Sequence, residues 1–158
     1  MDYLVNLSLL APDPELDARV RNAGVTIRRA LAPELELVTG WVRQKFSAGW
    51  SSETAVSMMR QPPTCFLATE GEKLVGFACH ESIARGFFGP TGVDEAMRGQ
   101  GIGHALLLAS LLDLKAMGYA YAIIGDVGPS EFYERTVGAT QIPNSEPGIY
   151  AGLLKSAD

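Results

Sequence analysis

The stretch "MRGQGIGHALLLASLL" (residues 97–112) places three glycines, Gly99, Gly101 and Gly103, directly before one of the most apolar runs of the chain. The apolar run predicts a buried helix over residues 101–117. Helices normally begin at a Ser, Thr, Asp or Asn cap, and this loop contains none. The first N–H groups of such a helix are free and carry about half a positive charge, and glycines let an anion approach them. The stretch therefore predicts a phosphate-binding helix start; the alternatives are a solvated glycine turn and close helix–strand packing.

The spacing of the glycines limits the kind of phosphate site. A dinucleotide-binding loop has the pattern G-x-G-x-x-G, and His104 stands where its third glycine is needed. The Walker pattern G-x-x-x-x-G-K-[ST] does not occur in the sequence. What remains is R-x-x-G-x-G, from Arg98 to Gly103, after a segment that ends "TGVDEAM". A dinucleotide-binding protein is thus the weaker alternative.

The composition predicts a single globular domain over residues 1–158. Hydrophobic residues make up 47% of the chain and charged residues 20%, which is enough apolar material for one core. The net charge of −5 and the lack of a Lys/Arg run argue against a nucleic-acid partner. The apolar runs are too short to span a membrane, and the N-terminus has no basic region of a secretory signal. We therefore expect no membrane partner and a cytoplasmic location.

Residues 64–81 have the pattern of a β-hairpin that pairs Cys65 with Cys79. Both faces of this hairpin are apolar, as in a sheet covered by helices on both sides. The two cysteines are expected to be small buried core residues rather than a disulfide or nucleophiles. The sequence contains no CxxC, HExxH or Cys/His cluster, so no metal site is predicted.

The order of expected elements is that of an α/β domain with a mixed sheet. A strand–helix–strand unit surrounds the glycine loop, and the second of these strands is expected to be parallel to the first. The elements are a helix at 13–24, a strand at 25–31, a helix at 33–46, a second helix capped by Ser51 and running to about Arg60, the hairpin at 64–81, a strand at 84–93, the helix at 101–117, a strand at 119–126, a helix at 129–137 and closing strands at 139–142 and 150–155.

The phrase "GVDEAMRGQGIGHALL" resembles the acyl-CoA-binding motif of the GNAT superfamily of N-acyltransferases, and "PSEFYERTVGA" is similar to a second segment of that family. The resemblance covers residues 25–155. It implies a mixed central sheet of about six to seven strands flanked by helices on both faces. Residues 1–23 are expected to be an N-terminal extension outside the common fold.

The resemblance also implies how acetyl-CoA is held. The backbone of Val93 would pair with the pantetheine arm where Pro90 and Gly92 interrupt the strand, and its amide would polarise the thioester carbonyl. Tyr133 matches the tyrosine that protonates the departing thiolate and contacts the cofactor. The coenzyme A pyrophosphate would be held by the loop N–H groups of Arg98, Gly99, Gln100, Gly101, Ile102, Gly103 and His104.

An attacking amine with a pKa near 10.4 must lose a proton, at about 4–5 kcal/mol at pH 7. Family members often have a carboxylate on the strand before the loop, and "GFFGPTGV" carries none. Asp126, at the carboxyl end of its strand, is a candidate base or orienting acceptor. Glu81 and His80, at the end of the preceding strand, are further candidates, and deprotonation through water without a dedicated base stays open.

The acceptor is expected to lie near "SAGWSSE" and "PNSEPGIY", where Trp50, Glu53 and Tyr150 would line its site. The sequence thus predicts an N-acetyltransferase that moves an acetyl group from acetyl-CoA to a primary amine of a small molecule or peptide. The transfer is direct, so no acyl-enzyme is required. The alternative is a non-catalytic acyl-CoA-binding sensor or interaction module. A homodimer is left open.

Overall fold

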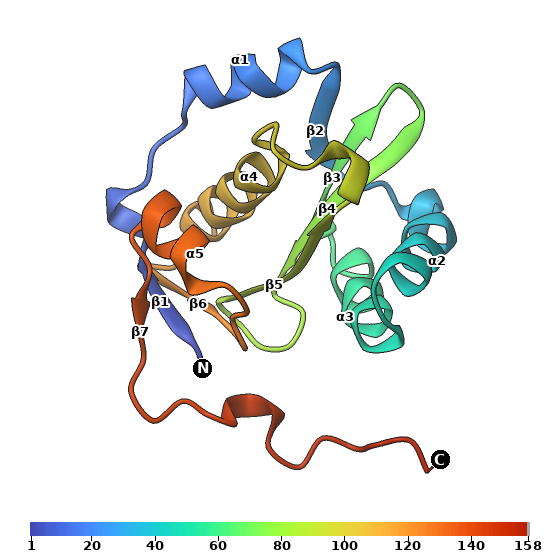
Figure 1. The fold of residues 1–158 in the computed structure, drawn as a ribbon. Coiled ribbons are helices and arrows are strands. Elements are labelled where there is room, and N and C mark those ends of the chain that lie inside the picture. The colour runs from blue at the N-terminus through green and yellow to red at the C-terminus, as the bar shows by residue number, and fades with distance from the viewer. Residues whose placement is uncertain (158) are drawn as a thin grey trace.

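A seven-stranded mixed sheet organises the chain in the computed structural model, which describes residues 1–157 (Figure 1). Its strand order is β2-β3-β4-β5-β6-β1-β7, and every neighbouring pair is antiparallel except β5 and β6. The strands are β1 (Tyr3–Asn6), β2 (Val25–Arg29), β3 (Cys65–Glu70), β4 (Lys73–His80), β5 (Phe87–Val93), β6 (Tyr121–Ile124) and β7 (Thr140–Gln141). The helices are α1 (Pro14–Asn22), α2 (Leu35–Lys45), α3 (Ala48–Met58), α4 (Ile102–Ala116) and α5 (Ser130–Val137).

Helices cover both faces of the sheet, as the apolar hairpin predicted. Strands β3 and β4 pair Cys65 with Cys79, and both cysteines are free, fully buried core residues. They belong to the core between the sheet and the α2–α3 pair. The other core packs α4 against the opposite face, together with side chains of α1, β1 and α5. The α/β class and the two-sided covering are therefore confirmed.

Two local predictions are wrong. Helix α3 begins at Ala48 with Ser47 as its cap, because the Ser47 hydroxyl accepts a hydrogen bond from the N–H of Trp50. Ser51, the expected cap, lies buried inside the helix, and its hydroxyl donates to the Thr39 carbonyl of α2. The closing strand expected at 150–155 does not form: Gly148–Tyr150 make a turn of 3-10 helix, and no strand follows it up to residue 157. The last strand is β7, which has two residues and ends shortly before Pro143, a residue with no N–H for a ladder.

The segment of residues 1–23 contributes to the sheet. Strand β1 lies between β6 and β7 and is antiparallel to both. The Val5 side chain is fully buried. Four residues give too short an alternation of apolar and polar side chains to identify a strand from the sequence. The place of β1 in the sheet also depends on partners more than 100 residues away. Helix α1 then returns over the end of α4 (Figure 1).

Strands β5 and β6 separate soon after they meet. Their parallel pairing, which the sequence predicted, consists of Phe87 with Ile123 and Phe88 with Ile124. Beyond Phe88 the strand β5 keeps its pairing with β4 up to Val93, but it has left β6. The split exposes one edge of β5 along the residues that the sequence marked with glycine and proline.

Candidate active site

A cavity of about 1070 Å³ occupies the gap between the separated strands. Its walls come from β5, from the loop after β6, from the glycine loop with the first turn of α4, and from α3 and α5. Cavities of this size suit a cofactor-sized ligand. The position also agrees with the general rule that α/β sheets bind ligands at the carboxyl ends of their strands, where neighbouring strands diverge.

The glycine loop forms one wall of the cavity, and its backbone is open to a ligand. Gly101 precedes α4 with a φ of 85°, a conformation that favours glycine, and no side chain caps the helix. Among residues 1–157, none accepts a hydrogen bond from the backbone N–H groups of residues 99–104. The loop residues that line the cavity are Arg98, Gly99, Gly101, Ile102, Gly103 and His104. Of the predicted set only Gln100 does not line it, and its side-chain amide donates to the Met97 carbonyl at 3.4 Å.

The end of β5 adjoins this loop. Val93 lines the cavity, and the Arg98 side chain folds back so that its Nε donates to the Val93 carbonyl at 3.3 Å. The carbonyl is thereby tied to the loop that the sequence assigned to the pyrophosphate. A ligand in contact with both the loop and β5 spans one continuous wall.

Tyr133 lies on α5 and lines the cavity. Its ring is held edge-on by Phe132 and Phe88, with ring centroids 5.1 and 6.5 Å away. Burial raises the pKa of the Tyr133 hydroxyl, so the group carries its proton at neutral pH. Within residues 1–157 its hydroxyl has no hydrogen-bond partner. The Tyr133 hydroxyl therefore keeps its proton and is not engaged by the described protein.

Asp126 follows β6 and also lines the cavity. Its φ of 47° turns the chain sharply at the end of the strand, and its N–H donates to Oδ1 of Asp2 at 2.9 Å. The N-terminal segment thus fixes the backbone of this turn. The structure thus places Asp126 at the cavity wall, and its chemical role stays a prediction.

The opposite end of the cavity is aromatic and acidic. The Phe46 ring lies where a side chain at position 92 would otherwise stand, so Gly92 lets it pack on β5. Trp50 stacks on Phe46 with ring centroids 5.1 Å apart. One turn further along α3, Glu53 accepts a hydrogen bond from the Tyr150 hydroxyl at 2.7 Å. As expected from the sequence, Trp50, Glu53 and Tyr150 all line the cavity.

Glu53 is half-buried, and burial raises the pKa of its carboxyl group although the hydrogen bond from Tyr150 opposes the change. No cation forms an ion pair with Glu53 among the residues that the structure describes. Burial and Glu53, with smaller effects of Asp126 and Asp2, raise the pKa of Tyr150. This end of the cavity therefore attracts a positive charge and disfavours a negative one.

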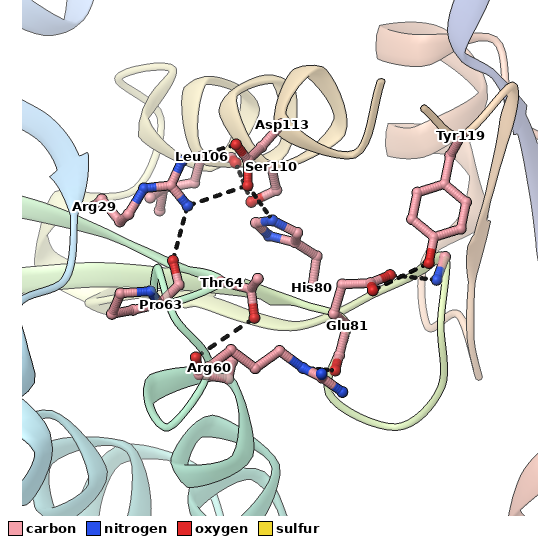
Figure 2. A network of polar contacts seen from close by, with 12 residues as sticks. Arg29, Arg60, Pro63, Thr64, His80, Glu81, Leu106, Ser110, Asp113 and Tyr119 are labelled. Atoms are coloured by element: carbon pink, nitrogen blue, oxygen red, sulfur yellow. Dashed lines mark hydrogen bonds and ion pairs between the residues drawn. The ribbon is translucent and has the colours of Figure 1, made fainter. Parts of the chain in front are cut away.

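His80, a candidate base, lies away from the cavity, on the face of the sheet that α4 covers (Figure 2). Its Nε2 is 2.6 Å from Oδ2 of Asp113, and Asp113 is also held by both terminal nitrogens of Arg29. Burial lowers the pKa of His80, and Asp113 opposes that shift. Successive side chains of a strand point to opposite faces of the sheet. A shift of one position along β4 therefore decides which face a side chain such as that of His80 reaches.

Glu81, the third candidate base, is also outside the cavity lining. It is buried, and its carboxylate accepts hydrogen bonds from the N–H of Gly86 and from the Tyr119 hydroxyl (Figure 2). Its carbonyl accepts from Arg60 Nε at 2.8 Å. These contacts close the turn between β4 and β5, so the placement gives Glu81 a structural role and does not support a role as base.

Two arginines that the sequence interpretation passed over line the cavity near the glycine loop. Arg19 comes from α1, and its Nη2 donates to the Gly99 carbonyl at 2.9 Å. Arg135 comes from α5. Both are exposed residues on amphipathic helices, and no local pattern distinguishes them from ordinary solvated arginines. Only the packing of α1 and α5 beside the loop brings them together.

Residues 1–157 contain no group of three or more His, Cys, Asp or Glu side chains arranged to hold a metal ion. In the same part of the chain, no helix combines the length and the apolar character needed to cross a bilayer.

Residues 32–139 match the model of the acetyltransferase (GNAT) family. This match covers more than half of the chain, and the protein therefore belongs to the GNAT acetyltransferase family. The resemblance deduced from the glycine loop and the "FYE" segment is confirmed. No curated protein matches the sequence.

Solved structures of the same fold support the architecture. A GCN5-related glucosamine N-acetyltransferase region of a fungal multi-domain GH3 β-N-acetylglucosaminidase aligns with a TM-score of 0.69, at 16% identity over 86% of this chain and 19% of that one. A GNAT family N-acetyltransferase (YhbS) from Escherichia coli in complex with CoA aligns with a TM-score of 0.56, at 22% identity over 80% and 71%. A GCN5-related N-acetyltransferase from Sphaerobacter thermophilus aligns with a TM-score of 0.57, at 20% identity over 88% and 47%. The chain spans less than half the length of several such structures, and at these identities the likeness concerns the fold.

Proposed function

We propose that the chain transfers an acetyl group from acetyl-CoA to a primary amine of a small molecule or peptide, by direct attack of the amine on the thioester. One observation carries this proposal. A single cavity joins an uncapped glycine loop, suited to phosphate, to an acidic and aromatic end, suited to a cationic amine. Family membership and relatives crystallised with CoA support acyl-CoA as the co-substrate.

The co-substrate would bind along the wall formed by β5 and the loop. The N–H groups of residues 99–104 and the positive end of the α4 dipole would hold the pyrophosphate. The pantetheine arm would lie against the edge of β5 that β6 has left, where an extended ligand can pair with free backbone groups. At the end of this edge the Val93 amide would polarise the thioester carbonyl, a contribution of about 3 kcal/mol for one such donor.

The amine would enter at the acidic end. Its ammonium group would bind Glu53, with the Asp126 carboxylate nearby and the rings of Trp50 and Phe46 beside its apolar part. We assign Glu53 as the proton acceptor. Its carboxyl group is partly desolvated, which raises its pKa toward the working pH, and a base is most efficient when its pKa lies there. Asp126 would orient the amine.

The net reaction removes two protons from the ammonium nitrogen. Glu53 takes the first and later releases it to water. The neutral nitrogen then attacks the thioester carbonyl carbon, the C–S bond breaks, and the departing sulfur takes the hydroxyl proton of Tyr133. The second nitrogen proton returns to the Tyr133 oxygen through solvent as the amide forms. The raised pKa of Tyr133 keeps its proton in place until a thiolate develops.

Release of free thiol during incubation with acetyl-CoA and a panel of primary amines and amine-bearing peptides tests this function. We expect thiol release above the hydrolytic background with at least one cationic amine, and none with the alcohol analogue of that amine. An acyl-CoA-binding sensor would instead bind acetyl-CoA and release no thiol with any member of the panel. A dinucleotide-binding protein would bind NADH at least as tightly as coenzyme A.

A further inference from the structure

Helix α1 is in direct contact with the glycine loop, although it lies outside residues 32–139 that match the family model. Arg19 Nη2 donates to the Gly99 carbonyl at 2.9 Å. A Cβ at Gly101 would lie 3.1 Å from Leu16 and 3.5 Å from Nη1 of Arg19. The guanidinium of Arg19 therefore lies beside the loop, and it also lines the cavity. The N-terminal segment is thus part of the wall on which the cofactor would bind.

Two arginines, Arg19 and Arg135, line this end of the cavity beside His104. Burial lowers the pKa of His104 most; Asp13 opposes the shift, and the charges of Arg135 and Arg19 lower the pKa further. Both arginines thus lie close enough to His104 for their charges to act on it. Asp13 caps α1 through the N–H of Leu16, and Arg135 forms no ion pair or side-chain hydrogen bond with the residues of the described chain.

These cations exceed what the pyrophosphate alone requires. The N–H groups of the loop and the helix dipole already supply donors for a pyrophosphate. Arg19 has used one of its five guanidinium N–H groups on the Gly99 carbonyl. Its remaining donors, together with those of Arg135, are suited to a further phosphate group, because guanidinium binds phosphate through paired hydrogen bonds.

We propose that Arg19 of α1, with Arg135 of α5, binds the ribose 3′-phosphate of acyl-CoA, so that the N-terminal helix completes the cofactor site. The inference rests on the proposed acyl-CoA function. With the thioester near Val93 and Tyr133, and the pyrophosphate on the loop, the ribose would follow beyond the loop, which Arg19 contacts at Gly99 and where Arg19 and Arg135 both act on His104. A phosphomonoester there carries a charge of about −1.5 to −2 at pH 7, which makes it the strongest anion for these two cations.

Affinity for coenzyme A and for 3′-dephospho-coenzyme A, measured by calorimetry, separates this role from others. The variants are Arg19→Gln, Arg135→Gln and a matched control, Arg21→Gln, on the same helix. Arg21 is exposed and outside the cavity lining. We expect Arg19→Gln and Arg135→Gln each to weaken coenzyme A binding roughly tenfold, as for loss of a charged hydrogen-bond pair, and to change dephospho-coenzyme A binding less than about threefold. Arg21→Gln should leave both affinities unchanged.

The titration of His104, followed by NMR of its imidazole, gives a second readout. Coenzyme A should raise the pKa of His104 more than dephospho-coenzyme A does, because the added phosphate places negative charge beside the ring.

Equal loss of affinity for both ligands in Arg19→Gln would overturn the assignment and make Arg19 a residue that positions the loop through Gly99. Unchanged affinity in both Arg19→Gln and Arg135→Gln would also overturn it. Arg135→Gln keeps the test independent of the loop, since Arg135 makes no bond to it. A wild-type protein that binds neither ligand would instead refute the proposed function, and the phosphate site with it.

Discussion

The polar groups of the cavity and those of the network around His80 differ in how many hydrogen-bond partners the protein gives them. In the network, Arg29 pairs with Asp113, Asp113 with His80, and Glu81 with Gly86 and Tyr119 (Figure 2). Most of its buried polar atoms therefore have a partner, and Nδ1 of His80 has none among the described residues. Polar groups at the cavity have few protein partners.

A buried polar group without a partner costs about 1–3 kcal/mol. The network avoids that cost for Arg29, Asp113 and Glu81, and it links β2, β4 and α4. The cavity keeps its free N–H groups, its carboxylate and its tyrosine hydroxyl, and a ligand is the partner that would satisfy them. The difference separates the two glutamates: Glu81 is buried outside the cavity and holds the N–H of Gly86 and the Tyr119 hydroxyl, whereas Glu53 lines the cavity and accepts only from the Tyr150 hydroxyl among the described residues. By this criterion Glu53 replaces Glu81 as the candidate base.

Glu53→Gln should have the largest effect on the cavity, as a loss of catalytic activity. The amide keeps the size and can still accept from Tyr150, but it cannot take a proton. We expect kcat/KM with an active amine to fall about 100-fold or more, and acetyl-CoA affinity to stay unchanged. Glu36→Gln, an exposed glutamate on α2, is the matched control and should keep full activity. A variant with wild-type kcat/KM at every pH would remove Glu53 from the mechanism.

Gly101→Val tests the loop. The φ of 85° and the contact with Leu16 mean that valine strains the backbone and also stands among the free N–H groups. Coenzyme A at 100 times its Kd should stabilise the wild type by about 2.7 kcal/mol, and we expect the variant to show no such gain. NADH should stabilise the wild type much less than coenzyme A does.

Gly118→Val is the control for strain in that experiment. Gly118 has a φ of 103° at the other end of α4 and no neighbour within 4 Å of an added Cβ. It should lose stability yet retain its rise in Tm with coenzyme A. If Gly101→Val still responds to coenzyme A as the wild type does, the loop is a structural turn.

Asp113→Asn tests the network, where we expect a loss of stability and no loss of coenzyme A binding. Replacing the carboxylate weakens its bonds to Arg29 and His80, and we expect a loss of about 2 kcal/mol in the free energy of unfolding, measured with urea. Arg29 and His80 together lower the pKa of Asp113 against the effect of burial. The wild-type advantage should therefore be present above the ordinary Asp pKa of about 3.9 and disappear as the pH falls through the lower pKa of the folded state. Coenzyme A affinity at pH 7 should not change, and a large change would mean that the two regions are coupled.

Tyr133→Phe removes only the hydroxyl, so the contacts of the ring with Phe88 and Phe132 should survive. We expect kcat to fall at least about tenfold, the low end for acid catalysis because water can replace the donor in part, with acetyl-CoA affinity nearly unchanged. Tyr121→Phe, an exposed tyrosine on β6, serves as the control. An unaltered kcat would leave Tyr133 as a packing residue, whereas a large loss of acetyl-CoA affinity would make its hydroxyl a binding contact.

The smallest effect concerns stability. Burial raises the pKa of Glu53, so its ionisation destabilises the folded state. That penalty is absent below the unfolded pKa of about 4.3 and is fully present above the folded pKa. Glu53→Gln should therefore have the same Tm as the wild type near pH 4 and a slightly higher Tm at pH 8. A lower Tm at pH 8 would indicate that the carboxylate stabilises the fold.

Sequence reasoning reached the parts of the molecule that local patterns determine. The loop from Arg98 to His104, the hairpin that pairs Cys65 with Cys79, and the helix with Tyr133 have their signals within a few neighbouring residues. The Ser51 cap was wrong because Ser47, four residues earlier, caps the helix instead. The strand at 150–155 was wrong because the chain there forms a 3-10 helix at Gly148–Tyr150 and sends the Tyr150 hydroxyl to Glu53, a contact between distant residues.

The contributions of the N-terminal segment could not be predicted, because they depend on contacts between distant parts of the chain. Strand β1 gains its place from β6 and β7, and Arg19 gains its place from a contact with Gly99, 80 residues away. The choice between Glu81 and Glu53 likewise depended on which carboxylate lines the cavity and which one closes a turn, and no sequence pattern records that.

Backbone amide shifts measured by NMR during titration with coenzyme A test most directly whether the free groups of the cavity belong to a ligand. We expect the amide resonances of Gly99, Gly101, Gly103 and His104 to move furthest, since their N–H groups would acquire a phosphate as acceptor, while those of His80 and Asp113 stay in place. Saturable binding that leaves the four loop amides unmoved, or no binding at all, would contradict the proposed site.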